Sequence, residues 1–328
     1  MCSNAVKGHD LGEIITQACQ RAVGILLPSQ WGCTDTFQNL NIRLDAIIND
    51  SSATLLSRAY VDPSTRLAVI FGTGLNAAIH LPITSLNPRK LGSRILPSHG
   101  ETSHVLINTE LSMFGKNIFP TTRWDDMLNR NHIVPDYQPL EYLISGGYMG
   151  EIVRLILIEA TETAGLFGGD LPPSLRTPYV LDTRTLAAIE VDTSPSLTDS
   201  RILLQERHPC PNPPTYFDIN FLRRTIQAVS CRSSAFLTTG IYALSSLMQN
   251  LETHDSVQNQ LDLLDHVSIG CDGSVINKYP GFMTSSQSII DQLVELESNG
   301  TKRVVLEKTV NSAVLGAGVA VAMAAMTA

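Results

Sequence analysis

The stretch LAVIFGTGLNAAIHLP, residues 67–82, places two short apolar runs on either side of a glycine turn. Gly72, Gly74 and Ala77 match the G-x-G-x-x-A spacing of a dinucleotide-binding turn. Such a site needs a helix directly after the turn, and here Pro82 follows too early for one to form. Two strands joined by a tight turn fit the pattern better, so we predict a β-hairpin and no dinucleotide site.

The same turn is still a candidate for holding a phosphate. Glycines allow successive N–H groups to converge on an anion, and the Thr73 hydroxyl would add a further donor. A plain hairpin without a ligand is the alternative, and the turn taken alone favours it.

Strands and helices alternate along the rest of the chain, which predicts an α/β protein. The expected helices cover 11–27, 51–61, 139–167, 219–250, 288–300 and a tail of small residues over 313–326. The expected strands cover 44–49, 67–71, 77–81, 104–111, 266–271 and 302–309. Residues 166–215 are rich in Pro, Thr and Ser, so we expect them to be irregular and exposed.

The composition is that of a globular protein with an acidic surface. Of the 328 residues, 43% are hydrophobic, which is enough for a sizeable core. The 23 basic and 31 acidic residues give a net charge of −8, without a block of basic residues. This balance argues against binding to nucleic acid or to an anionic membrane.

The cysteines and the two ends of the chain suggest a cytoplasmic location. Six cysteines show no C-x-x-C pair and no metal-ligand spacing, so we expect reduced thiols and no metal site. The polar residues at the start lack the apolar core of a signal peptide. The apolar run over 313–326 is too short to span a bilayer, so we expect no membrane span.

Polar residues lie at the ends of two expected strands. Asp50 stands at the end of the apolar run 44–49, where ligands bind in α/β sheets, but the residue taken alone favours a helix cap. Asn108 and Glu110 alternate along a strand and so share one face, where they could hold hydroxyl groups. An exposed strand end is the alternative for this pair.

Three further candidates lie at turns or helix starts. The carboxylate of Glu141 suits the first turn of a helix, whose dipole favours negative charge. The run CDGSV at 271–275 follows a strand, and an ordinary Asp-Gly turn is its simplest reading. Ser312 opens the last helix. The free N–H groups at this helix start can be satisfied by a capping side chain, which is the commoner case, or by a phosphate.

The order of these motifs decides more than any one of them. The sequence shows IINDSSATLL, then GTGLN, then INTE, then QPLEYLISGGYMGE, then CDGSV. This series resembles the eukaryotic hexokinase family, which has N-D-[ST]-x-x-T-L, G-T-G-x-N, N-x-E, Q-x-x-E-x-x-x-[SG]-G-x-Y-[LM]-G-E and D-G-S. The segments GTGLNAAI and QPLEYLISGGYMGE look most similar to the atypical fungal hexokinase-like and N-acetylglucosamine-kinase-like branch.

The resemblance implies an actin-like ATPase fold of the ribonuclease H-like type, with two lobes around a cleft. The large lobe would be largely complete over 49–316, and the small lobe mostly missing. Residues 1–48 would be a remnant of the small lobe, and 317–328 a C-terminal helix that returns towards it.

The resemblance also implies roles for individual residues. Asp50 would be the general base that accepts the proton of the attacking sugar hydroxyl. The residues implied to hold the sugar are Asn49, Asn76, Asn108, Glu110, Gln138 and Glu141. The residues implied to surround the nucleotide are Gly72, Thr73, Gly74, Asp272, Gly273, Ser274 and Ser312. ATP would bring Mg²⁺, and no residue is implied as a direct metal ligand.

The departures from the family pattern concern the first phosphate loop and the sugar site. The family's D-x-G-G-T hairpin is not found, and the chain starts at a point that matches the end of the first lobe. Leu111 and Ser112 replace an aromatic residue and a glycine beside the sugar-binding glutamate. We therefore expect an N-terminally truncated, impaired sugar kinase acting on glucose or an N-acetylhexosamine. A catalytically inactive regulatory or accessory protein is the alternative, and a partner protein could cover the exposed edge of the lobe.

Overall fold

A five-stranded mixed sheet forms the centre of the molecule in the computed structural model, with the strand order β3-β2-β1-β4-β5. The structure describes residues 13–15, 44–87, 89, 104–253, 266–297 and 302–327. The strands are β1 (Thr65–Phe71), β2 (Leu75–Pro82), β3 (His104–Asn108), β4 (His266–Asp272) and β5 (Arg303–Lys308). β1, β2 and β3 are antiparallel neighbours, whereas β4 runs parallel to both β1 and β5.

The predicted hairpin over residues 67–82 is confirmed, because β1 and β2 pair from Leu67 opposite Ile79 to Phe71 opposite Leu75. Alternation along the strand gives each face its own core. Leu67, Val69 and Phe71 enter the main core of the protein, whereas Ala68 joins a small cluster with Leu55 of helix α2 (Asp50–Val61).

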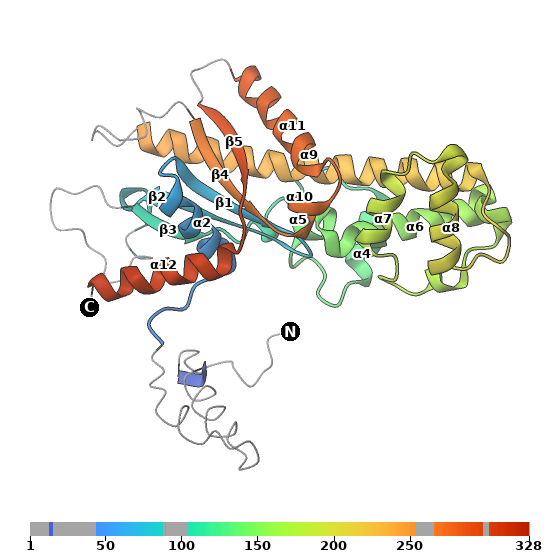
Figure 1. The fold of residues 1–328 in the computed structure, drawn as a ribbon, viewed down its shortest axis with the longest axis horizontal. Helices are drawn as coiled ribbons and strands as arrows, with labels where there is room; N and C mark the ends of the chain where they lie inside the picture. The colour runs from blue at the N-terminus through green and yellow to red at the C-terminus, as the bar shows by residue number, and fades with distance from the viewer. Residues whose placement is uncertain are drawn as a thin grey trace, which may run out of the picture.

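Helices cover both faces of the sheet (Figure 1). On one face lie α2 (Asp50–Val61) and α12 (Ser312–Thr327), which pack against each other. The other face holds α9 (Tyr216–Thr253) and α11 (Phe282–Leu296). A Cβ at position 316 would lie only 1.9 Å from the Ala53 carbonyl oxygen, so Gly316 allows α12 to approach α2 this closely.

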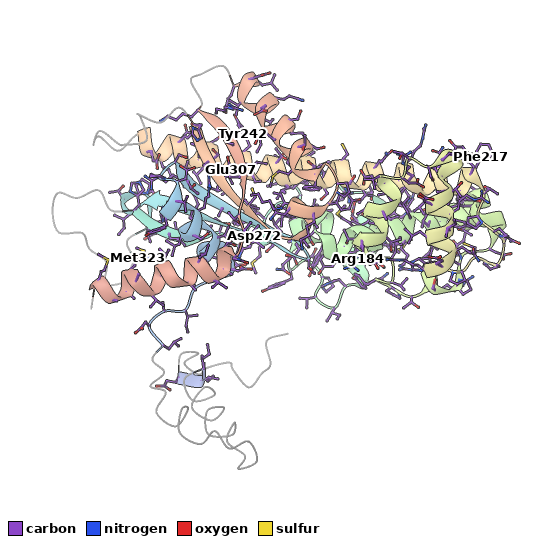
Figure 2. All side chains as sticks on the ribbon, viewed as in Figure 1. Arg184, Phe217, Tyr242, Asp272, Glu307 and Met323 are labelled. Atoms are coloured by element: carbon purple, nitrogen blue, oxygen red, sulfur yellow. The ribbon has the colours of Figure 1, made fainter. Side chains whose placement is uncertain are left out.

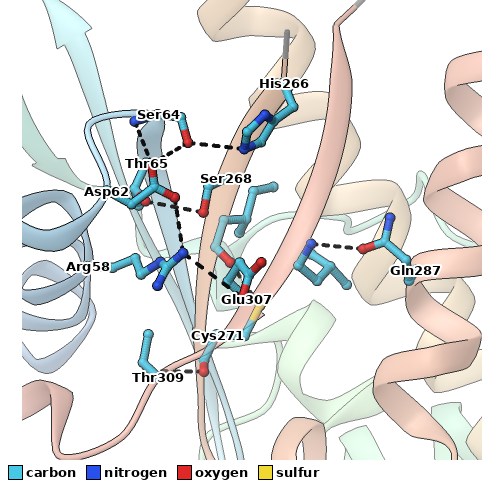
Figure 3. Close-up of polar contacts among 12 residues, drawn as sticks. Arg58, Asp62, Ser64, Thr65, His266, Ser268, Cys271, Gln287, Glu307 and Thr309 are labelled. Atoms are coloured by element: carbon cyan, nitrogen blue, oxygen red, sulfur yellow. Dashed lines mark hydrogen bonds and ion pairs between the residues drawn. The ribbon is translucent and has the colours of Figure 1, made fainter. Parts of the chain in front are cut away.

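Polar contacts fix the C-terminal end of α2 to the sheet (Figure 3). Arg58 donates to Asp62 at 3.0 Å and lies 4.0 Å from Glu307 of β5. Asp62 in turn accepts from the backbone N–H of Ser64, at 3.0 Å. These contacts orient α2, whose other end carries Asp50 at the edge of the sheet where β1 and β4 end.

A block of helices extends from this edge, and α9 runs through both parts of the molecule (Figure 1). Its helices are α4 (Arg123–Asn131), α5 (Pro139–Ile144), α6 (Gly146–Ala164), α7 (Thr183–Glu190) and α8 (Thr198–Arg207), with α10 (Ser274–Lys278) at the junction. Short 3₁₀ turns cover Ile83–Ser85, Leu111–Met113, Leu166–Gly169, Pro173–Arg176 and Pro195–Leu197. None of the helices in the described ranges is long and apolar enough to cross a membrane.

Three expectations about secondary structure are wrong. Residues 44–49 form no strand, and Ile47 is 55% exposed, so this apolar run has no sheet neighbour to bury it. The single helix expected over 139–167 is broken at Ser145, where the chain turns to contact the β1–β2 turn. The region 166–215 holds α7 and α8 and buries leucines such as Leu186 and Leu204 completely.

The other expected elements are found with shifted ends. The last strand, the long helix α9 and the small-residue helix α12 are confirmed, and α11 begins at Phe282, before the predicted start at 288. The helix expected over 11–27 lies outside the described residues except for the helical 13–15. The proposed division at 48 and 316 stays a prediction. α12 runs without a break across residue 316.

Candidate functional site

The β1–β2 turn is held in place by the start of α6. The N–H groups of Gly146 and Gly147 donate to the carbonyl oxygens of Gly72 and Thr73 at 2.9 and 3.0 Å, and the Ser145 hydroxyl donates to the Thr73 oxygen at 2.8 Å. A Cβ at position 146 would lie 2.7 Å from the Gly72 oxygen. The two glycines of α6 are therefore required for a close approach between backbones, and this approach breaks the helix at Ser145.

A second loop packs against the same turn. Gly273 has φ +121° and ψ 156°, a conformation that only glycine adopts without strain. A Cβ there would lie 2.3 Å from the Phe71 oxygen, and a Cβ on Gly72 would lie 3.2 Å from the Ser274 nitrogen. The Asp272 carboxylate accepts from the Gly273 N–H at 2.7 Å and so fixes the start of the loop.

A buried chain of hydroxyl groups links this loop to α2. The Ser312 hydroxyl donates to the Asp272 carboxylate and lies 2.9 Å from the Thr54 hydroxyl. Thr54 in turn donates to the Asp50 carbonyl oxygen at 3.0 Å. Ser312 is 1% exposed, so its hydroxyl serves these protein contacts. The first residue of α2 is thus tied to the end of β4.

The Asn49–Asp50 pair forms the N-terminus of α2. Asn49 is the N-cap residue, and its side-chain oxygen accepts from the Ser51 N–H at 2.9 Å. One Asp50 carboxylate oxygen also accepts from the Ser51 N–H, at 2.8 Å. The capping role therefore belongs to Asn49, and the exposed Asp50 side chain lies in the first turn, where the helix dipole favours its charge.

Asn108 and Glu110 lie together, as the alternation predicted, although the strand ends at Asn108. The Asn108 side-chain amide donates to the Glu110 carboxylate at 2.7 Å. Glu110 adopts φ +52°, a left-handed conformation that is uncommon for a residue with a side chain. This strained turn directs the carboxylate back towards Asn108.

Glu141 joins α5 to the β1–β2 turn. Its carboxylate accepts from the Leu75 N–H at 2.8 Å, and a Cβ on Gly74 would lie 2.8 Å from the same oxygen. Burial raises the pKa of Glu141 above its usual value, the Leu75 N–H opposes this shift, and the negative charge of Glu110 adds to it. The two carboxylates are therefore close enough to repel each other.

Of the two remaining candidates, Gln138 contacts the Glu110 turn, and Asn76 lies on the neighbouring strand. Gln138, the N-cap of α5, donates to the buried Ser112 hydroxyl at 3.3 Å, so it connects the Glu110 turn to the helix that carries Glu141. The Asn76 side chain accepts from the Ala77 N–H at 2.7 Å and lies on β2, next to β3.

A hollow of about 360 Å³ opens beside Thr73 and Ser274. We call it the Thr73 hollow; it is lined by Thr73, Gly146, Thr183, Arg184, Ala187, Ser274, Val275, Lys278 and Tyr279. Figure 2 shows Arg184 in the helical block and Asp272 where the sheet meets α12. Two cationic side chains beside a glycine turn are suited to the negative charge of a phosphate.

Thr183, Arg184 and Lys278 were missed by the sequence analysis. Residues 183 and 184 lie in the region expected to be irregular and exposed, and Lys278 lies three residues beyond the Asp-Gly turn considered at 271–275. Asp182 was the available signal for the start of a helix here, because aspartate is a common N-cap residue. In the structure its carboxylate caps α7 by accepting from the Thr185 N–H at 2.7 Å.

The structure thus brings the predicted residues into two adjoining groups. The side-chain group consists of Asn76, Asn108, Glu110, Gln138 and Glu141. The glycine group consists of Gly72, Thr73, Gly74, Asp272, Gly273, Ser274 and Ser312. Asn49 and Asp50 lie at the start of α2, which the hydroxyl chain connects to the glycine group.

Comparison with known proteins gives one family and its fold. A family model described as Hexokinase matches residues 66–323. Hexokinase-1 of Schizosaccharomyces pombe is 30% identical over 281 residues, which are 85% of this chain and 51% of that protein. Hexokinase-1 of Saccharomyces cerevisiae is 30% identical over 75% of this chain and 47% of its own length.

A solved structure agrees with these relatives. The hexokinase of Schistosoma mansoni, solved in complex with glucose, superimposes with a TM-score of 0.77 and 25% identity, covering 97% of this chain and 63% of that one. The predicted actin-like ATPase fold is confirmed. The chain spans about half the length of the curated relatives that it matches.

Proposed function

Because the chain belongs to the hexokinase family, we propose that it carries the phosphoryl-transfer site of a sugar kinase. The reaction would move the γ-phosphate of ATP to a hydroxyl of a hexose, either glucose or an N-acetylhexosamine. The observation that carries the proposal is the contact between the side-chain group and the glycine group at Gly74 and Glu141. Phosphoryl transfer depends on such positioning of two substrates more than on covalent chemistry.

The side-chain group would hold the hexose. Carboxylate and amide groups such as Glu110, Glu141, Asn108 and Gln138 accept from and donate to sugar hydroxyls. Their contacts to one another support the proposal, because each holds its neighbour in the position in which a sugar would find it. Asn49 and Asn76 complete the set by resemblance.

Asp50 would act as the general base. Its carboxylate is exposed at the start of α2, and its backbone is fixed by the hydroxyl chain that ends on Asp272. A base held in this way accepts the proton of the attacking sugar hydroxyl as the bond to phosphorus forms.

The nucleotide would lie across the glycine group, with phosphates beside Gly72–Gly74 and the Thr73 hollow. Arg184 and Lys278 would face its negative charge. Mg²⁺ would enter with the ATP phosphates, which supply its oxygen ligands and which it helps to neutralise. The residues 272–274 would lie nearer the adenosine.

Turnover by this chain alone is expected to be weak. The glycine hairpin offers donors to the phosphates from one side, and the sequence contains no D-x-G-G-T hairpin to offer them from the other. A catalytically inactive protein with a regulatory or accessory role is the second candidate, which the same missing motif favours. Under either candidate function, we expect the protein to be cytoplasmic.

A partner segment would cover part of α12. This helix carries no charged residue, and it exposes Val314, Leu315 and Met326 at 76%, 58% and 87% (the neighbouring Met323 is labelled in Figure 2). Such an apolar face is typical of a surface that another polypeptide covers. The mass of the native protein tests this: a single chain of 35.7 kDa that stays monomeric would contradict it.

The test of the proposed function is ADP release from Mg–ATP with a panel of hexoses. We expect Asp50→Ala and Asp50→Asn to lower the rate by about 10²–10⁴-fold, since both remove the base. Asp50→Asn is the matched variant because its amide oxygen can still accept from the Ser51 N–H.

Calorimetric titration with the same hexoses separates the two candidates. Binding of a hexose by wild type and Asp50→Asn, without ADP release by either, would establish the inactive protein. ADP release that is unchanged in Asp50→Asn would show that another group acts as the base.

A further inference from the structure

Glu190 and Tyr279 form a hydrogen bond in a part of the protein that the proposed function leaves unused. The Tyr279 hydroxyl donates to one carboxylate oxygen of Glu190 at 2.6 Å, and the Ser230 hydroxyl donates to the other at 2.9 Å. Tyr279 is 6% exposed and Glu190 is half-buried, so the bond is partly shielded from water. Hydrogen bonds to a charged acceptor are stronger than neutral ones, and most so away from water.

The two partners come from the two walls of the Thr73 hollow. Glu190 is the last residue of α7, and that helix begins with Thr183 and Arg184, which line the hollow. Tyr279 directly follows α10, which starts at Ser274, and its ring also lines the hollow. The hydrogen bond therefore joins the helix that carries Arg184 to the loop that carries Gly273.

The other end of α7 is held independently. The Thr183 hydroxyl donates to the Gly146 carbonyl oxygen at 2.5 Å, and Gly146 itself donates to the Gly72 oxygen. With both ends attached, the distances of α7 from the β1–β2 turn and from the 272–279 segment are both fixed. Arg223 of α9 also donates to the Glu190 carbonyl oxygen at 3.2 Å, and the buried Leu186 and Ile189 keep α7 on the core. Removing the Tyr279 attachment would therefore loosen the C-terminal end of α7 relative to the 272–279 segment alone.

Tyr279 is suited to a permanent attachment. Burial, together with the hydrogen bond to Glu190, raises the pKa of the Tyr279 hydroxyl well above its usual value. The hydroxyl therefore remains a donor throughout the physiological pH range. Losing it would leave one oxygen of the half-buried Glu190 carboxylate without this donor, which favours a shift of the carboxylate towards water.

We propose that Tyr279 and Glu190 are positioning residues for the nucleotide: their hydrogen bond holds α7, and with it Arg184, at the distance from the 272–274 loop that the phosphates require. The inference rests on the proposed function in one respect, namely that the ligand of the Thr73 hollow is a nucleotide. Neither residue touches the reacting atoms; both act through Arg184 and Thr183.

The test compares two variants that each remove one hydroxyl from the same carboxylate. Tyr279→Phe keeps the ring in the wall of the hollow and removes the attachment to the 272–279 segment. Ser230→Ala removes the contact of the same carboxylate to α9, where Arg223 still donates to the Glu190 carbonyl oxygen, and it leaves the hollow unchanged. A purely structural role predicts equal losses of stability and no selective effect on ligands.

We expect Tyr279→Phe to raise the Kd of Mg–ATP by about five- to tenfold, the scale of one hydrogen bond. The Kd of a hexose should change less than about twofold, and Ser230→Ala should leave both constants near those of the wild type. Glu190→Gln keeps an acceptor for Tyr279 and should recover most of the nucleotide affinity that Glu190→Leu loses. Titration calorimetry measures all of these constants.

A double-mutant cycle shows whether the effect passes through Arg184. In an Arg184→Ala background, Tyr279→Phe should cost little further Mg–ATP affinity. Full additivity of the two substitutions, or an equal loss of nucleotide and hexose affinity in Tyr279→Phe, would overturn the proposal.

Failure of the proposed function is distinguishable from failure of this inference. If the wild type binds no Mg–ATP, the nucleotide role is lost and the attachment is judged by hydrogen exchange of the α7 amides alone. Faster exchange across 183–190 in Tyr279→Phe than in Ser230→Ala would then support the attachment, and equal exchange would overturn it.

Discussion

The two halves of the candidate site are built in different ways. The side-chain group, with Glu110 and Glu141, is held by hydrogen bonds between side chains and by one strained turn. The glycine group, with Gly72 and Gly273, is held by close contacts between backbones, and the approach at Gly273 is too close for any Cβ. Substitutions in the first half should therefore change ligand binding at little cost in stability, and substitutions in the second half should change the fold itself.

The largest expected effect is that of Gly273→Ala on stability. The added Cβ would lie 2.3 Å from the Phe71 oxygen at a backbone conformation that only glycine tolerates, so we expect a loss of about 3 kcal/mol or more. Denaturant unfolding measures the loss. Gly281→Ala is the control, because Gly281 also has positive φ but has open space around it, and about 1 kcal/mol is expected there. Equal losses for both would show that the backbone contact is not what requires Gly273.

Glu141→Gln should lower the affinity for hexose and leave the fold intact. The amide keeps an acceptor for the Leu75 N–H, so the hairpin is preserved, but the charge that would accept from a sugar hydroxyl is lost. We expect hexose affinity to fall by about 10- to 100-fold, measured by calorimetry. Unchanged affinity would remove Glu141 from the proposed sugar site.

The difference in stability between the wild type and Glu141→Gln should depend on pH. Burial raises the folded-state pKa of Glu141 above 4.5, so ionisation costs the native state stability as pH rises through and above that value. Relative to wild type, Glu141→Gln should become more stable between about pH 4 and about pH 7. Glu162→Gln, at an exposed position of α6, should show no such trend, and a trend of equal size in both would contradict the assignment.

The smallest expected effect belongs to the hydroxyl chain between the two halves. Thr54→Val removes contacts to Ser312 and to the Asp50 carbonyl, and should cost about 1–2 kcal/mol. Thr161→Val is matched to it, because within the described ranges the buried Thr161 hydroxyl contacts only the Leu157 carbonyl oxygen of its own helix. The difference between the two unfolding free energies measures the Ser312 contact, and no difference would mean that the chain contributes nothing.

The same contrast explains which parts of the site could be predicted from the sequence. The hairpin and the Asn108–Glu110 pair follow from alternation and turn residues, which are local signals. The break at Ser145 could not be found in this way, because its cause is the Gly72–Thr73 backbone, about seventy residues away in the chain. Propensity favours one helix over 139–167, and a tertiary contact overrides it.

The wall of the Thr73 hollow was missed for a related reason. The many prolines and threonines of 166–215 predict loops, and the structure indeed has three short 3₁₀ turns there. α7 nevertheless forms, because Leu186 and Ile189 are completely buried against the core. The family resemblance supplied the motif order, but a helix without a motif carries Arg184.

The long helix α9 has a mechanical consequence. With 38 residues it is about 57 Å long, and it packs on the sheet at one part of its length and on α6 and α7 at another. When a straight helix of this length tilts by one degree at the sheet, its far end moves by about 1 Å. A mutation that bends α9 would therefore displace the helical block, and Arg184 with it, without touching the hollow.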